Sequence, residues 1–237
     1  DDITINGGKL TIDSSDDCIH CGGDMKLTGG ILSLASADDG AHSDHSLTIG
    51  NGSADTFDDI MITVTKAYEG IEGQNITQNS GTVLVTSTDD GFNAAGGADS
   101  SGAGNPGGPG GPGRPGGQQW GQGSMDTSGT SYCMTFNGGL ALVNVTDGDH
   151  DGYDSNGDIK LNGGIQITNG NEPFDCGDHG NTISVNGSTW VSNCRSGGMQ
   201  MGGSEMSYSV YKSSSTSAGT RLSLVSNDKV IVSFLTG

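Results

Sequence analysis

The 237-residue sequence has few basic side chains, because nine Lys and Arg stand against 28 Asp and Glu and give a formal net charge of −19. Nucleic acids and anionic membrane surfaces are bound through Lys and Arg patches, so this balance argues against both as partners. No apolar run approaches the length of a membrane-spanning helix, which argues against insertion into a bilayer. We therefore expect a monomer that binds neither nucleic acid nor membrane.

Large apolar residues are also scarce: aromatic residues make up 5% of the chain, which contains 44 glycines. Low hydrophobicity with high net charge is typical of disorder. The apolar residues nevertheless recur as short alternating triplets such as LTI, LSL and ITV, a pattern that predicts very short strands. Because apolar periodicity of helix length is missing, we expect an all-β chain.

A five-residue unit recurs six times, as DDCIH, DDGAH, YEGIE, DDGFN, HDGYD and NEPFD. Its second place is an acid at positions 17, 39, 69, 90, 151 and 172, at spacings of 22, 30, 21, 61 and 21 residues. The long spacing contains the Gly/Pro-rich stretch 96–131, and without these 36 residues it falls to 25. Repeats of this size indicate a solenoid, and two or three short strands per repeat favour a parallel β-helix.

The repeat covers most of the chain, so we expect one β-helix domain over residues 1–237. Residues 96–131 are expected to leave the stacked coils as an inserted loop. Residues 204–237 break the repeat and alternate over two runs around SND, which predicts a β-hairpin that caps the open end of the solenoid.

Stacked coils place the acids of neighbouring repeats about 4.8 Å apart. Two carboxylates at that distance repel each other by roughly 3 kcal/mol at an effective dielectric constant near 20. Exposure, protonation or a bound cation relieves this repulsion, and oxygen ligands of this kind suit Ca²⁺. His20 and His42 end their units, and we expect them to pack or hydrogen-bond within the turn because calcium prefers oxygen. The candidate metal ligands of these turns are Asp16, Asp17, Asp38, Asp39, Glu69, Glu72, Asp89, Asp90, Asn93, Glu172 and Asp175.

The stretch DGDHDGYDSNGD, residues 147–158, concentrates five aspartates in twelve positions. It fits the calcium-loop pattern D-x-[DN]-x-[DN]-G-x₅-E, except that aspartate replaces the final glutamate. Strand patterns flank it, so we expect calcium on a scaffold other than a helix–loop–helix. The alternative is an exposed turn that hydrogen-bonds to its own backbone. The candidate ligands are Asp147, Asp149, Asp151, Asp154 and Asp158.

The five cysteines are compatible with an oxidising compartment. Cys176 and Cys194 lie 18 residues apart, close to one repeat, and are expected to meet as a disulfide on neighbouring turns. Cys18 and Cys21 form a C-x-x-C, which indicates a local disulfide or one half of a zinc site.

The ordered motifs DDGAH, YEGIEG, DDGFNAAGG, the Gly-rich insertion, HDGYDSNGDI and SAGTRLSLVSNDKVIVSF resemble bacterial extracellular carbohydrate-binding β-helix proteins related to polysaccharide lyases. The resemblance extends over nearly the whole chain. It implies a right-handed parallel β-helix, more than one bound Ca²⁺, secretion or cell-surface display, and binding of plant cell-wall polysaccharide such as cellulose or pectin.

Similar turns hold calcium in one class of β-helix pectate lyases. That likeness implies three ligand pairs, Asp38 with Asp39, Asp89 with Asp90, and Asp151 with Asp154. Two of these same units depart from the pattern at the last place, where His42 and Asn93 replace an acid, and in another unit Glu69 and Glu72 replace aspartates.

These features predict a non-catalytic, calcium-dependent carbohydrate-binding protein. The candidate sugar platforms are Tyr68, Trp120, Tyr153 and Trp190. One alternative is a pectate lyase acting by calcium-assisted β-elimination, which needs a base. Lys66 and Lys160 lie nearest to the acidic turns, but neither belongs to a recognisable catalytic motif, so no catalytic residue is assigned. The other alternative is a structural cell-surface adhesin in which the metal only stabilises the fold.

Overall fold

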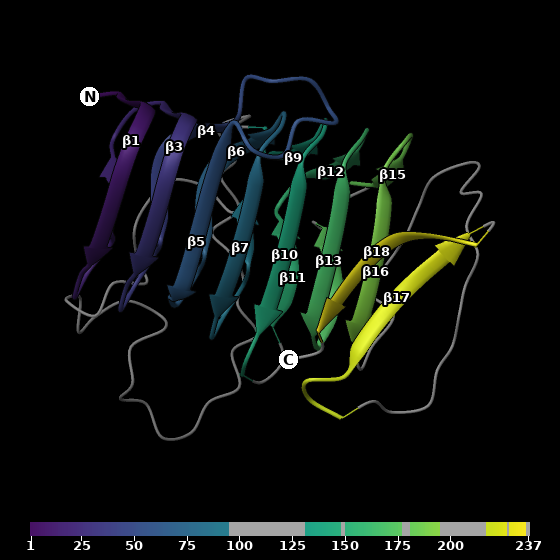
Figure 1. The fold of residues 1–237 in the computed structure, drawn as a ribbon. Coiled ribbons are helices and arrows are strands. Elements are labelled where there is room, and N and C mark those ends of the chain that lie inside the picture. The colour runs from purple at the N-terminus through teal and green to yellow at the C-terminus, as the bar shows by residue number, and fades with distance from the viewer. Residues whose placement is uncertain (95–130, 148–149, 177–180, 195–216, 227, 236–237) are drawn as a thin grey trace.

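The structure is a computed structural model that describes residues 1–94, 131–147, 150–176, 181–194, 217–226 and 228–235. The described chain is all-β and contains no helix, so it includes no helical segment that could cross a membrane. Sixteen strands form one sheet, which curls nearly into a barrel, and two further strands form a separate hairpin (Figure 1). The fold class expected from the triplets is thus confirmed as all-β.

All strand pairs of the large sheet are parallel, and they form three ladders. The first contains β1 (Ile3–Asp13), β3 (Met25–Ala35), β5 (Ile60–Lys66), β7 (Thr82–Ser87), β10 (Leu140–Val145), β13 (Ile165–Gly170) and β16 (Thr189–Cys194). The second contains β2 (His20–Cys21), the starts of β4 (Ala41–Ile49) and β6 (Ile71–Gln78), β8 (Phe92–Ala94), β11 (Asp151–Ser155) and β14 (Glu172–Cys176). The third joins the start of β3 and the ends of β4 and β6 to β9 (Cys133–Phe136), β12 (Asp158–Leu161) and β15 (Ile183–Val185).

The second ladder contains the five-residue unit, in the register that the repeat predicts. The last residues of successive units are partners in the sheet, in the order His20, His42, Glu72, Asn93, Asp154 and Asp175. Parallel pairing between repeats is therefore present. The winding of the chain as a right-handed parallel β-helix stays a prediction.

The core is narrow and is built from alternate residues of each strand, as in Leu32 and Leu34 of β3. A row of aromatic rings fills its second half, with centroids 5.1 to 5.6 Å apart. These rings are Phe92, Phe136, Tyr153, Phe174 and Trp190. One or two apolar residues per strand are enough for such a core, which explains the low hydrophobic content of the sequence.

Glycine in the third place of the unit lets the acidic turn lie against the opposite wall of the core. A Cβ atom on Gly40 would lie within 2.9 Å of the side chain of Val64, and one on Gly91 would strike Val143 and the carbonyl oxygen of Gly152. Only a residue without Cβ permits this approach, so the glycines keep the preceding acids close to the interior.

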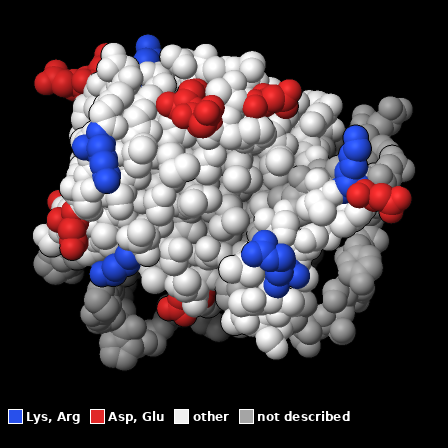
Figure 2. Space-filling model, viewed as in Figure 1, with Lys and Arg blue, Asp and Glu red and all other residues white. Residues whose placement is uncertain are grey.

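The first ladder presents a broad outer face with few charges. Figure 2 shows that the middle of this face has no charged side chains. At the later strands, Leu222 of the hairpin β17 (Arg221–Ser226) and β18 (Lys229–Leu235) packs on this face. It packs against the buried Ile167, as Leu140, Leu142, Ile165 and Val191 also do. The expected hairpin is therefore present; that it caps the end of the solenoid stays a prediction, and the insertion at 96–131 lies almost wholly outside the described residues.

The predicted disulfide is not formed, because all five cysteines are thiols in the structure. Cys176 ends β14 and is in register with Ser155, whereas Cys194 ends β16 and is in register with Gly170. The two residues therefore belong to different ladders. A spacing close to the repeat length was misleading, since only positions in the same ladder meet on neighbouring turns.

We predict that Phe92→Ala lowers the free energy of unfolding by about 3–5 kcal/mol, because the fully buried ring contacts both Phe136 and Tyr153. The control is Val225→Ala at a side chain that is 54% exposed, which should change it by less than about 0.5 kcal/mol. Urea denaturation followed by circular dichroism measures both. Similar small losses in the two variants would contradict the aromatic core.

Candidate metal centre

The second-place acids lie above one another on successive strands. The backbone N–H of Asp39 donates to Asp17 Oδ1 at 3.0 Å, and the N–H of Asp151 donates to Asp90 Oδ1 at 2.8 Å. Acids in the last place of the unit stand beside them. We call these second-place and last-place acids together the acidic column, defined as Asp17, Asp39, Glu69, Glu72, Asp90, Asp151 and Asp154. The stacking of acids that the repeat predicts is therefore present.

Much of the acidic column is buried. The exposed fraction is 0% for Asp39, 6% for Glu72, 7% for Glu69 and 8% for Asp90. Burial and the charge of Asp39 raise the pKa of Glu69 well above its ordinary value, and burial with the charge of Asp154 does the same for Asp90. Uncompensated buried carboxylates are costly, so this part of the molecule needs protons or cations.

The later part of the column consists of carboxylates and one amide, with His150 beside Asp89. Asn93 Nδ2 donates to Glu69 Oε2 at 2.7 Å, while the buried Asn93 Oδ1 has no hydrogen-bond partner. Burial and the charge of Asp154 raise the pKa of Asp151 to about 8, and burial and the charge of Asp175 raise the pKa of Asp154 to about 7. Carboxylate and amide oxygens in this arrangement fit a hard divalent cation such as Ca²⁺. We call Glu69, Asp89, Asp90, Asn93 and Asp154 the oxygen segment.

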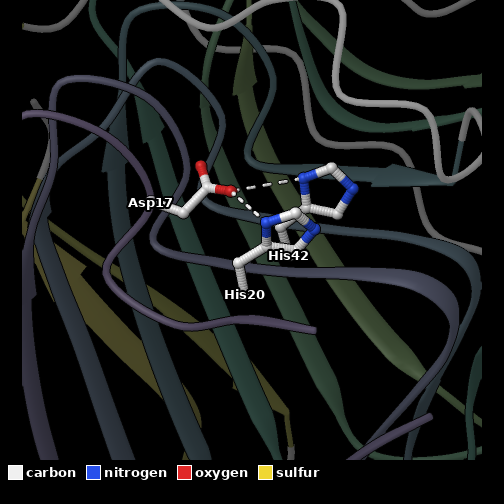
Figure 3. Close-up of side chains that lie close together, drawn as sticks. All are labelled: Asp17, His20 and His42. Carbon is white, nitrogen blue, oxygen red and sulfur yellow. Dashed lines mark ion pairs between the residues drawn. The ribbon is translucent and has the colours of Figure 1, made fainter. Parts of the chain in front are cut away.

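The earlier part of the column surrounds a buried histidine. His42 is 0% exposed, and its Nδ1 lies 3.2 Å from Glu72 Oε2 and 3.3 Å from Asp39 Oδ2. The same Nδ1 lies 3.5 Å from Asp17 Oδ2 (Figure 3). Burial alone would lower the pKa of His42, but the surrounding carboxylates outweigh it and raise the pKa to about 11. The expectation that this histidine makes contacts within the turns is confirmed. Its position at the centre of three acids was not foreseen.

His20 repeats the position of His42 one strand earlier. The two rings stack with centroids 4.6 Å apart, and both Nδ1 atoms lie 3.5 Å from Asp17 Oδ2 (Figure 3). Both Nε2 atoms face Asp44 Oδ1, at 2.9 Å from His20 and 3.7 Å from His42. Sequence reasoning missed Asp44, which lies outside the repeated unit. Its alternate spacing from His42 along β4 is the signal that could have found it.

The first-place acids lie beside the column. Ligand atoms of Asp16, Asp17 and Asp38 come within 4.8 Å of one another, as do those of Asp89, Asp90 and His150. Glu172 and Asp175 continue the arrangement to the last strand of the ladder, in register with Asp151 and Asp154. These predicted ligands are therefore brought to one side of the molecule.

The described strand residues of the acidic loop 147–158 belong to different ladders, and calcium binding by this loop stays a prediction. Asp147 is exposed, and Asp149 lies outside the described residues. Asp158 begins β12 in the third ladder, where its Oδ1 accepts a hydrogen bond from the backbone N–H of Thr182 at 2.9 Å. Asp151 and Asp154 belong to the column instead. The match to a calcium-loop pattern thus joined residues that the strands assign to two ladders.

Two of the four predicted sugar platforms belong to the core. Tyr153 is fully buried and donates its hydroxyl to the carbonyl oxygen of Ala141 at 3.0 Å, so its ring is not available to a ligand. Trp190 packs edge-on against the buried Phe174. Tyr68 is half-buried, and burial with the neighbouring Asp89 raises its pKa. Trp120 lies outside the described residues.

The described lysines form no ion pair with the described acids. Every ion pair between described residues joins a histidine to a carboxylate, with no Lys or Arg taking part. Lys66 and Lys160, the bases considered for a lyase, are both exposed on their strands. Among the described residues, the column therefore has metal-ligating groups without an adjacent lysine base.

Comparison with protein families gives one match: the family described as "Carbohydrate-binding domain-containing protein" matches residues 1–40. This segment holds β1 and β3 and the first acidic turns, including Asp17 and Asp39. Comparisons with curated proteins and with solved structures find no match. The family match supports carbohydrate binding.

We predict that the metal-free protein loses stability as the pH rises from about 4 to about 8. Asp151 and Asp154 have an ordinary pKa of 3.8 and folded values of about 8 and 7, so their contribution favours the folded state at low pH. It is lost as the pH rises through the folded values. Melting temperatures of chelator-treated, desalted protein across this range measure the trend. A melting temperature that stays flat or rises would contradict the buried column.

Proposed function

We propose that this protein is a non-catalytic, calcium-dependent carbohydrate-binding protein, folded as a right-handed parallel β-helix, that acts outside the bacterial cell on plant cell-wall polysaccharide. The observation that carries the proposal is the carbohydrate-binding family match over residues 1–40, which falls on the first strands of the sparsely charged outer face. Secretion or surface display stays a prediction from the sequence resemblance.

The outer face of the first ladder is the surface that we propose for the sugar chain. Two rows of outward positions across its strands contain no acid, in a chain with 28 of them, and the next outward position of β1 is Asp13. Ile31 and Met61 are neighbours in register and are 51% and 42% exposed. The two rows are Lys9, Ile31, Met61, Thr82, Leu140, Ile165 and Thr189, and Thr11, Ser33, Thr63, Leu84, Leu142, Ile167 and Val191. Because the hairpin packs at Ile167, the part of the face proposed for the sugar is that of β1, β3, β5 and β7.

A flat face of hydroxyl and aliphatic groups suits a neutral glucan such as cellulose. Hydroxyl side chains can exchange hydrogen bonds with sugar hydroxyls, while Ile31 and Met61 can cover the apolar face of a pyranose ring. Calcium that bridges protein to a pectin carboxylate needs exposed ligands, yet Asp39, Glu69 and Asp90 are buried. Burial therefore favours a neutral polysaccharide over polygalacturonate as the ligand.

Calcium in the oxygen segment would be held by Glu69, Asp90, Asn93 and Asp154, with Asp89 beside them. Enclosed among buried carboxylates, it would supply positive charge that keeps the turns of neighbouring repeats together. In this proposal calcium supports the shape of the outer face and does not contact the sugar. Sugar binding would then depend on calcium because Ca²⁺ that binds only the folded state stabilises that state.

We predict that the effect of Asp90→Asn on stability depends on calcium. At a Ca²⁺ concentration 100 times the dissociation constant, the free energy of unfolding of wild type should rise by about 2.7 kcal/mol, and the variant should lose most of that rise. In chelator, the variant should be at least as stable as wild type, because it removes one buried charge while the amide oxygen can still accept from Asp151. Thermal melts in both buffers measure this.

The matched control for Asp90 is Asp13→Asn, at an exposed acid of β1, which should change neither melt. A loss of stability in Asp90→Asn that is equal in calcium and in chelator would mean that Asp90 has only a structural part.

We predict that Ile31→Asp and Met61→Asp each weaken binding to insoluble cellulose by at least about tenfold, or about 1.4 kcal/mol. Each places a charge at an exposed position of the proposed face, so folding should be little affected. Val225→Asp, at an exposed position of the hairpin, is the control and should bind as wild type does. Depletion isotherms with calcium present measure the affinities.

Three outcomes would contradict parts of this proposal. Undiminished binding in both aspartate variants would place the sugar elsewhere. Retention by polygalacturonate alone would favour pectin, and release of unsaturated, ultraviolet-absorbing products from it would favour the lyase. No retention on any polysaccharide would favour the adhesin.

A further inference from the structure

We propose that Asp39, His42 and Glu72, with Asp17 at the edge of the site, form a binding site for a divalent first-row transition metal ion of the zinc class, distinct in ligand chemistry from the oxygen segment. The site lies where the starts of β4 and β6 meet the turn before β2. It goes beyond carbohydrate binding and does not depend on it.

The distances around His42 match those between the ligands of a four-coordinate ion. Bonds of 2.0–2.1 Å in a tetrahedral zinc site place the ligand atoms about 3.3 Å from one another. His42 Nδ1 lies 3.2 Å from Glu72 Oε2, 3.3 Å from Asp39 Oδ2 and 3.5 Å from Asp17 Oδ2. Ligand atoms of Asp39, His42 and Glu72 all lie within 4.8 Å of one another. His42 Nδ1 thus lies from three carboxylate oxygens at about the distance that separates two ligands of a tetrahedral ion.

Buried polar atoms without hydrogen-bond partners point into this space. Both ring nitrogens of His42, both carboxylate oxygens of Asp39 and Oε2 of Glu72 are enclosed and accept or donate no hydrogen bond of good geometry. His42 and Asp39 are both 0% exposed. Four of these atoms belong to the proposed site, namely Nδ1 of His42, both oxygens of Asp39 and Oε2 of Glu72, whereas Nε2 of His42 faces Asp44. Buried polar groups in native proteins are almost always satisfied, so four such atoms together indicate a missing ligand.

Asp44 supplies the outer contact that a metal-binding histidine usually has. Such a histidine presents one ring nitrogen to the metal and directs the other at a carboxylate, which fixes the ring and its tautomer. His42 Nε2 faces Asp44 Oδ1 at 3.7 Å, on the side of the ring opposite to the three acids. His20 stacks on the same ring and also faces Asp44, so the orientation of His42 is held from two directions.

The ligand types separate this site from the oxygen segment of the same column. Imidazole nitrogen suits zinc, nickel, iron and copper, whereas calcium takes oxygen ligands. In register, the position of His42 is taken by Glu72, then Asn93 and then Asp154 in the following strands, so nitrogen gives way to oxygen along the ladder. The column therefore offers a mixed nitrogen–oxygen site at its start and oxygen sites further on.

The competing interpretation is an ion-paired cluster without metal, in which a protonated His42 alone balances the acids. The two interpretations differ in what Zn²⁺ does when calcium already fills the oxygen segment. An ion-paired cluster leaves Zn²⁺ unbound or loosely bound at exposed acids, whereas the proposed site takes one ion tightly through an imidazole.

The test is calorimetric titration of chelator-treated full chain with Zn²⁺ in excess Ca²⁺, followed by X-ray absorption at the zinc edge. We expect one Zn²⁺ per chain, with nitrogen and oxygen neighbours at about 2.0–2.1 Å and the scattering of one imidazole. His42→Gln should weaken Zn²⁺ binding at least about 100-fold, and Asp44→Asn about 10- to 100-fold. His45→Gln, at an exposed histidine of the same strand, is the matched control and should bind as wild type does.

Circular dichroism checks that each variant is folded. If His42→Gln does not fold, Glu72→Gln and the wild-type absorption spectrum decide the question. Zn²⁺ binding that is absent in excess Ca²⁺, that survives unchanged in the His42 or Glu72 variant, or that shows no imidazole neighbour would overturn the site.

Discussion

Parallel pairing between repeats is the constraint on which the rest of the molecule depends, because it makes equal positions of the unit direct neighbours. Apolar positions then stack into the core, and acidic positions stack into the buried acidic column. The glycine that follows the acid in four of the six units brings the turn against the core wall. At Asp17 and Asp90 the acid accepts the backbone N–H of the next repeat. The same geometry that builds the core thus concentrates negative charge inside the protein.

The proposed metal sites and the proposed carbohydrate face lie on different ladders of the sheet. Buried oxygens and the imidazole of His42 gather on the second ladder, where ions would hold neighbouring turns together. The middle of the first ladder presents outward hydroxyl and aliphatic side chains without acids, where we propose that a sugar chain lies across several strands. In this proposal an enclosed ion would act on sugar binding only through the rigidity of the strands.

The repeat in the sequence predicted the strand register and the stacking of Asp17 on Asp39, because a fixed spacing leaves few ways to pair parallel strands. It also held a signal that was missed: the fourth place of the unit is apolar or aromatic throughout, at Ile19, Ala41, Ile71, Phe92, Tyr153 and Phe174. Tyr153 is therefore a core residue by position. Spacing could not predict the thiols of Cys176 and Cys194 or the place of Asp158, since it does not say to which ladder a residue belongs. The nearness of Asp44 to His42 follows from their alternate positions in β4, a signal that lies outside the repeated unit.

The central claim is that cations neutralise the buried acidic column. The most direct measurement is a crystal structure of the protein grown with Ca²⁺ and Zn²⁺, with anomalous diffraction recorded on both sides of the zinc edge. The account predicts a zinc peak bonded to His42 Nδ1 and a second, zinc-free cation peak among the oxygens of Glu69, Asp90 and Asp154. Well-ordered carboxylates with no cation peak at either place would contradict it.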